Sequence, residues 1–125
     1  MTDTEIVRLL REYLLKSCGR GEYGLLYLLA GEPNPFDTER TKRVRAWFQS
    51  LSREQQGMAI ELMDECADMC LFSFAVAMDG AHELADGLVF ELHVIDGGTK
   101  RLLTSGDKSF RGEYLHDVVV DVLKE

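Results

Sequence analysis

The sequence contains none of the short motifs that mark well-known catalytic or phosphate-binding sites. It has no Gly-x-Ser-x-Gly, no P-loop and no Gly-x-Gly-x-x-Gly. Gly19-Arg20-Gly21 is too short for a dinucleotide site and follows no expected strand, and Asp96-Gly97-Gly98 is typical of a turn. The sequence therefore favours a protein that is not an enzyme, and we expect no catalytic residue, no cofactor and no metal ligand.

The sequence also has no long apolar run, an acidic rather than a basic start, and few cysteines. No stretch of about 18 uninterrupted apolar residues occurs, which predicts that the chain does not span a membrane. The first five residues carry acid, unlike the basic start of a signal peptide. Three cysteines, an odd and small number, indicate free thiols in a reducing compartment. We therefore expect a cytoplasmic protein with no membrane partner.

The chain does contain enough apolar material for one core, and its charge is unevenly spread. Its 125 residues are 46% hydrophobic, which predicts a single globular domain over residues 1–125. The net charge is −8: residues 1–55 hold 9 basic against 8 acidic residues, and residues 56–125 hold 5 against 14. An acidic surface repels phosphates, so we expect no nucleic-acid partner and favour a basic protein partner.

Helix signals follow one another through the first half of the chain. Thr2 and Glu5 form a capping box for a first helix that runs to about Cys18. Its expected buried stripe consists of Ile6, Leu9, Leu10, Tyr13 and Leu14. The leucine-rich run that ends at Ala30 predicts a short buried helix.

A third helix is expected to start at Asn34-Pro35-Phe36-Asp37, with Asn34 as the cap and Pro35 at the first helical position. One of its faces is apolar and carries Val44, Trp47, Phe48 and Leu51. A basic cluster lies mostly on the other face and consists of Arg40, Lys42, Arg43 and Arg45.

A second capping box, Ser52 with Gln55, predicts a long helix that reaches about Met78. The last part, residues 69–78, is apolar nearly all round. We therefore expect this helix to be the central spine, with its C-terminal half innermost. Cys66 and Cys70 lie four residues apart on it and are expected to be core residues rather than half of a zinc site.

The last third of the sequence predicts a β-hairpin and a helix. Residues 88–95 alternate with period two, Asp96-Gly97-Gly98 marks the turn, and residues 100–104 form the return strand. Residues 113–123 are ambiguous between helix and strand, and the spacing of their apolar residues favours a helix. The predicted fold is α+β and mostly helical, with four to five helices around a long central helix, then a C-terminal antiparallel β-hairpin and a terminal helix.

Four carboxylates form an acidic stripe on the long helix at offsets of 0, 3, 4 and 7 residues: Glu61, Asp64, Glu65 and Asp68. A solvated face is the simplest interpretation, and a protein-interaction site for a basic partner is the functional one. The basic cluster is likewise interpreted as a solvated face, or as a counterpart to the acidic stripe of a second copy.

Glu91 and His93 share one face of the first strand, and His116 lies on the last helix. A carboxylate beside an imidazole can support proton transfer or bind a metal. If these three side chains converge, a small metal-dependent enzyme is an alternative.

The functional hypothesis that needs no catalytic or cofactor motif is a small acidic protein-interaction module of inhibitor, immunity or adaptor type. Such a protein acts by surface binding rather than by catalysis. A homodimeric regulatory or structural module is a further alternative, because a two-stranded hairpin is marginal alone and its unpaired edge can join a second copy.

Overall fold

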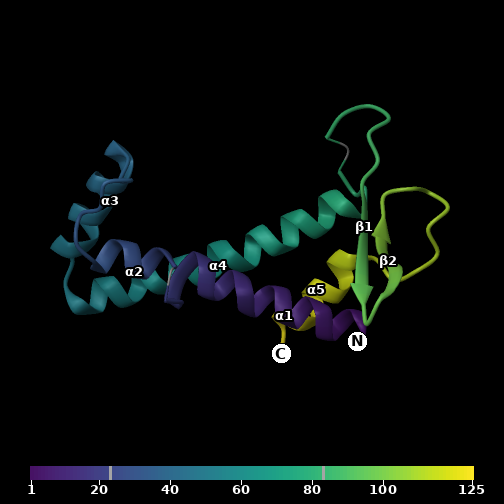
Figure 1. Ribbon diagram of the computed structural model, residues 1–125, viewed down its shortest axis with the longest axis horizontal. Coiled ribbons are helices and arrows are strands. Elements are labelled where there is room, and N and C mark those ends of the chain that lie inside the picture. Colours follow the sequence, from purple (N-terminus) through teal and green to yellow (C-terminus); the bar gives the residue numbers. More distant parts are fainter. Residues whose placement is uncertain (23, 83) are drawn as a thin grey trace. The chain divides into compact units, whose positions relative to one another are not determined.

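The computed structural model describes residues 1–22, 24–82 and 84–125, and its fold is the expected mostly helical α+β type (Figure 1). The helices are α1 (Asp3–Leu15), the π-helix η1 (Lys16–Arg20), α2 (Leu25–Ala30), α3 (Glu39–Ser50), α4 (Arg53–Met78) and α5 (Leu115–Leu123). Strands β1 (Glu91–Asp96) and β2 (Thr99–Ser105) form an antiparallel hairpin.

The chain is divided into two compact units. The first unit joins Met1–Arg11 to Met69–Glu125, and the second unit is Glu12–Asp68. Helices α1 and α4 each contribute residues to both units.

Both predicted capping boxes are confirmed. In the first, the amide of Glu5 donates to Thr2 Oγ1 (3.1 Å) and the amide of Thr2 donates to Glu5 Oε2 (2.7 Å). In the second, the amide of Gln55 donates to Ser52 Oγ (3.1 Å) and the amide of Ser52 donates to Gln55 Oε1 (2.9 Å). These pairs satisfy amides that the first turn of a helix leaves without partners, which is why the sequence located the starts of α1 and α4 correctly.

The predicted start of the third helix at Asn34 is wrong by four residues. Thr38 is the N-cap of α3, and its Oγ1 accepts a hydrogen bond from the amide of Thr41 at 3.1 Å. Asn34 instead forms a turn, in which its Oδ1 accepts from the amide of Phe36 at 2.7 Å. The side chain of Asn34 thus closes the loop before α3 rather than capping the helix.

The prediction that the last part of the long helix, residues 69–78, is buried on all sides is wrong, although the helix length of 26 residues is as expected. Its buried positions are Ala59, Ala67, Leu71 and Ala75, whereas Met69 and Phe74 are exposed. Cys66 and Cys70 are exposed free thiols rather than core residues. The buried face of α4 consists mostly of small alanine side chains together with Leu71, whereas several larger apolar side chains, among them Met69 and Phe74, stay exposed.

The stripe predicted for the first helix is buried only in part. Ile6 and Val7 are buried, whereas Leu9, Leu10 and Tyr13 are exposed. Apolar spacing identified the helix correctly but did not identify which apolar residues the fold covers.

The first unit confirms the predicted hairpin and terminal helix. Gly97 and Gly98 form the turn, both with positive φ angles (57° and 84°), as a two-residue hairpin turn of type I′ requires. Helix α5 buries Leu115, Val118, Val119 and Val122, so the spacing of apolar residues outweighed their strand propensity. The end of β2 is buried as well, at Leu103, Thr104 and Ser105.

Candidate functional site

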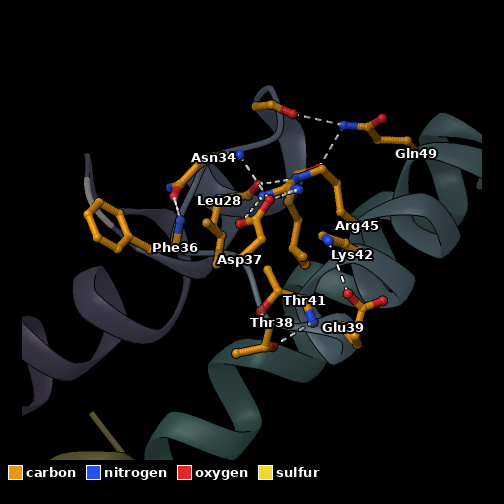
Figure 2. Close-up of polar contacts among 12 residues, drawn as sticks. Leu28, Asn34, Phe36, Asp37, Thr38, Glu39, Thr41, Lys42, Arg45 and Gln49 are labelled. Atoms are coloured by element: carbon orange, nitrogen blue, oxygen red, sulfur yellow. Dashed lines mark hydrogen bonds and ion pairs between the residues drawn. The ribbon is translucent and has the colours of Figure 1, made fainter.

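The second unit is organised by a buried ion pair between Arg45 and Asp37 (Figure 2). The two guanidinium Nη atoms of Arg45 donate to the two carboxylate oxygens of Asp37 at 2.6 and 2.9 Å. The side chains are 6% and 1% exposed. The hydrogen bonds from Arg45, with a further one from the amide of Asn34, lower the pKa of Asp37 from 3.8 to about 2.

The same region of α3 caps the C-terminal end of α2. Arg45 Nε donates to the carbonyl oxygen of Leu28 at 3.0 Å, and Gln49 Nε2 donates to those of Leu29 and Gly31 at 3.0 and 3.1 Å. The last carbonyls of a helix have no partner within the helix, so these donors complete α2 and fix it to α3. The interpretation of Arg45 as part of a solvated basic face is therefore wrong, because its partner Asp37 allows it to be buried.

The loop before α3 presents an aromatic side chain to solvent. Phe36 is 92% exposed, and Figure 2 shows its ring pointing away from the ion pair. Its backbone is held on both sides, since the amide of Phe36 donates to Asn34 Oδ1 and the amide of Asn34 donates to Asp37 Oδ2 at 2.9 Å. Phe36 is thus an exposed apolar residue on an anchored loop.

An open groove of about 670 Å³ lies in the same unit. Its apolar lining comes from α3, from α4 and from the first residue after α3: Trp47, Leu51, Met58, Ala59 and Leu62. Trp47, Met58 and Leu62 are 52%, 65% and 62% exposed. Large apolar side chains that stay half or more in water around one concave surface are typical of a binding site.

The groove has a firm base because its inner residues belong to the core of the unit. Ala59 clusters with the buried Leu29 and Phe48, and Leu51 packs against that cluster. Phe48 lies on the inner face of α3 with Arg45, whereas Val44 and Trp47 lie on the outer face. The groove is therefore built on packed helices rather than on loops.

Three of the four residues of the predicted acidic stripe line this groove: Glu61, Asp64 and Glu65. Glu61 and Glu65 are exposed. Asp64 is half-buried and accepts a hydrogen bond from Arg20 at 2.8 Å, so part of its charge is already neutralised within the unit. Asp68 is half-buried and is not among the lining residues. The groove therefore combines an apolar surface with a rim of carboxylates.

The rest of the basic cluster lies on the outer side of α3. Lys42 pairs with Glu39 at 3.0 Å, and Arg40 and Arg43 are exposed. The sequence identified the charges of both the acidic stripe and the basic cluster. It did not identify the groove, because the spacing of apolar residues along a helix does not show that Trp47, Met58 and Leu62 stay uncovered.

The three candidate catalytic residues belong to two separate clusters of hydrogen bonds in the first unit. His93 Nε2 lies 3.1 Å from Glu91 Oε2, and Ser105 Oγ donates to Glu91 Oε1 at 3.2 Å. His116 contacts a different carboxylate, with its Nδ1 2.5 Å from Asp79 Oδ2. Over the residues described, no group of three histidine, cysteine, aspartate or glutamate residues is arranged to hold a metal ion.

Asp79 is a residue that the sequence did not single out beyond its position at a helix end. Its side chain is fully buried and accepts hydrogen bonds from Thr104 and from the amides of Leu115 (2.9 Å) and His116 (2.7 Å). These amides are the first of α5, so a residue 36 positions earlier caps that helix. No local pattern signals such a cap, because donor and acceptor are far apart in the sequence.

Among the described residues, no helix is both long and apolar enough to cross a membrane. No family model, no curated protein and no solved structure matches this chain.

Proposed function

We propose that this chain is a protein-interaction module, and that the groove between α3 and α4 binds an apolar side chain flanked by basic residues. The observation that carries the proposal is the pairing of an exposed apolar lining with a carboxylate rim in one concave surface. The mode of action is surface binding, as in inhibitors, immunity proteins and adaptors.

The chemistry of the groove specifies the partner. Burying Trp47, Met58 and Leu62 removes apolar surface from water, which provides most of the binding free energy. Glu61 and Glu65 favour positive charge beside the apolar anchor and disfavour negative charge there, so they provide specificity and a faster association. A basic segment with one aromatic residue satisfies both requirements.

The test uses a synthetic peptide of about a dozen residues with a single Phe between arginines. Trp47 is the sole tryptophan of the chain and lines the groove, so its fluorescence reports occupancy directly. We expect saturable binding with a blue shift of Trp47 emission. Replacing the peptide's Phe by Ala, or its arginines by Glu, is expected to weaken binding at least about tenfold.

Two matched double variants locate the site. Glu61→Lys with Glu65→Lys reverses the rim and is expected to weaken peptide binding about tenfold. Glu113→Lys with Asp121→Lys changes the net charge equally at exposed positions of the first unit and is expected to leave binding unchanged. Equal loss in both double variants, or no response of Trp47 to the peptide, contradicts the proposal.

A further inference from the structure

The outer face of α3 is a stripe of residues at helical spacing. Arg40, Val44 and Trp47 follow one another at intervals of four and three residues, and Leu51 comes four residues later. The first three are exposed, and Leu51 is half-buried. The inner face, with Arg45 and Phe48, is already packed against the unit. The part of this stripe from Arg40 to Trp47 is therefore a partly apolar helix face that its own unit leaves uncovered.

The two ends of this stripe have opposite chemistry. The N-terminal end carries the exposed Phe36 on its anchored loop, with the exposed Arg40 and Arg43 on the first turns of the helix. The C-terminal end carries the groove, with its apolar lining and the carboxylates of Glu61 and Glu65. Helix α3 has 12 residues and is about 18 Å long, so the two ends are well separated.

The segment at the N-terminal end has the chemistry that the groove requires. It has one exposed aromatic residue followed by Arg40 and Arg43, and the exposed carboxylate of Glu39 between them is paired with Lys42. Phe36 is 92% exposed, so it does not fill the groove of its own chain. The chain thus carries both halves of one complementary contact.

We propose that the occupant of the groove is a second copy of this chain, and that the two copies pack with their α3 helices antiparallel. In this arrangement Phe36 of each copy enters the groove of the other, and its Arg40 and Arg43 face the other's Glu61 and Glu65. Val44 lies near the two-fold axis. A two-fold dimer requires a self-complementary surface, which a stripe with opposite ends provides when two copies run antiparallel. This inference rests on the proposed function, because it names the partner of the same groove.

The first experiment measures the dimer and the role of Phe36. Sedimentation velocity over a dilution series is expected to show a monomer–dimer equilibrium, with Trp47 emission moving to longer wavelength on dissociation. Phe36→Ala is expected to raise the dissociation constant at least about tenfold. Ile95→Ala removes a similarly exposed apolar side chain (72%) from the hairpin and is expected to have no effect.

The second experiment uses complementary charge reversal. One chain carries Arg40→Glu with Arg43→Glu, and the other carries Glu61→Arg with Glu65→Arg. Each alone places like charges together at both contacts of the dimer, so its dissociation constant is expected to rise at least about tenfold. In the mixture both contacts again join opposite charges, so a heterodimer of near wild-type stability is expected.

A wild-type chain that stays monomeric at roughly 100 μM and above, well beyond a micromolar dissociation constant, overturns this inference. So does a dimer that is unaffected by Phe36→Ala and by both charge reversals. A mixture of the two charge-reversed chains that associates no better than either chain alone overturns it as well. Loss of the dimer on Ile95→Ala instead identifies the hairpin as the interface and also overturns it. Peptide binding, measured where sedimentation shows the wild-type chain to be monomeric, tests the proposed function separately. If the chain stays monomeric and binds the peptide, only the proposed dimer is refuted. If the chain dimerises through α3 and its monomer does not bind the peptide, only the peptide-binding function is refuted.

Discussion

At the scale of single residues, Asp37 links the ionisation of one carboxyl group to the stability of the fold. Its pKa is lowered to about 2 in the folded chain by Arg45 and by the amide of Asn34, against an ordinary value of 3.8. The stabilisation that comes with a lowered pKa is fully present above the unfolded value and is lost as the pH falls through the folded one. The relevant window is therefore about pH 4 to pH 2.

Asp37→Asn removes this titration and leaves the guanidinium of Arg45 without its carboxylate. We expect the variant to be less stable than the wild-type chain at neutral pH, and the difference to shrink as the pH falls from about 4 to about 2. Urea denaturation followed by circular dichroism at several pH values measures the difference. Glu39→Gln, which removes an exposed carboxylate paired with Lys42, is the control and should show no such trend.

Asp79 has an equally local role in the first unit. Asp79→Ala leaves the amides of Leu115 and His116 and the hydroxyl of Thr104 without their buried acceptor. Loss of several buried hydrogen bonds to a charged group is expected to lower the free energy of unfolding by roughly 3 kcal/mol or more. Asp121→Ala, on the exposed side of the same helix, is expected to change it by less than about 0.5 kcal/mol. Similar losses in the two variants would show that Asp79 does not cap α5.

At the scale of helices and strands, one glycine within α4 and one just after it differ in whether the fold can accept a side chain at that position. Gly57 lies within α4, and a Cβ atom there would meet nothing within 4 Å. Gly80 follows α4 with φ +71°, and a Cβ atom there would lie 2.9 Å from Cα of Gly106. The first glycine weakens a helix, and the second permits a close approach of two backbone segments.

We therefore expect Gly57→Ala to raise the free energy of unfolding by about 0.5–1 kcal/mol, since alanine restricts the unfolded chain and favours the helix. Gly80→Ala is expected to lower it by more than about 1 kcal/mol, because both the φ angle and the space are unfavourable. Thermal and urea denaturation measure both. A stabilising Gly80→Ala would show that the turn after α4 tolerates a side chain.

The helices and strands were largely predictable because their signals are local. Ser52 with Gln55 fixes the start of α4, and Gly97-Gly98 fixes the hairpin turn, each through atoms within a few residues. The outward face of α3 was not predictable in this way. Trp47 and Val44 are apolar and Arg45 is charged, so composition alone assigns them to the wrong sides.

The candidate site was predictable in its charges and not in its shape. Glu61 and Glu65 were recognisable as one acidic stripe, because helical spacing places them together. The burial of Arg45 depends on Asp37, which reaches it only after the loop before α3 has folded back. The groove is lined by residues of α3 and α4 and by Leu51, and no spacing rule within one helix describes how they come together.

At the scale of the whole molecule, net charge and local charge act against each other in the proposed dimer. Two chains of −8 repel each other over long distances, whereas arginine–glutamate contacts attract over a few ångströms. The screening length is about 10 Å at 0.1 M salt and about 30 Å at 0.01 M. Salt near 0.1 M therefore suppresses most of the long-range repulsion and leaves much of the contact attraction.

The dimer is accordingly expected to be most stable near 0.1 M salt. Below about 0.02 M the net repulsion weakens it, and toward 1 M screening of the arginine–glutamate contacts weakens it again. Sedimentation equilibrium in a series of sodium chloride concentrations measures this optimum. A dimer that strengthens steadily up to 1 M would associate through apolar surface alone, without the charged contacts.

The anchored loop before α3 has an evolutionary consequence. Asn34, Asp37 and Arg45 hold its backbone, while Phe36 projects into solvent and supports no part of the core. Position 36 can therefore change under selection with little effect on folding. A copy of the gene that lost this phenylalanine would encode a chain that retains the groove and could bind a different protein there. A substitution at one codon would then change the partner from a second copy of the chain to another protein.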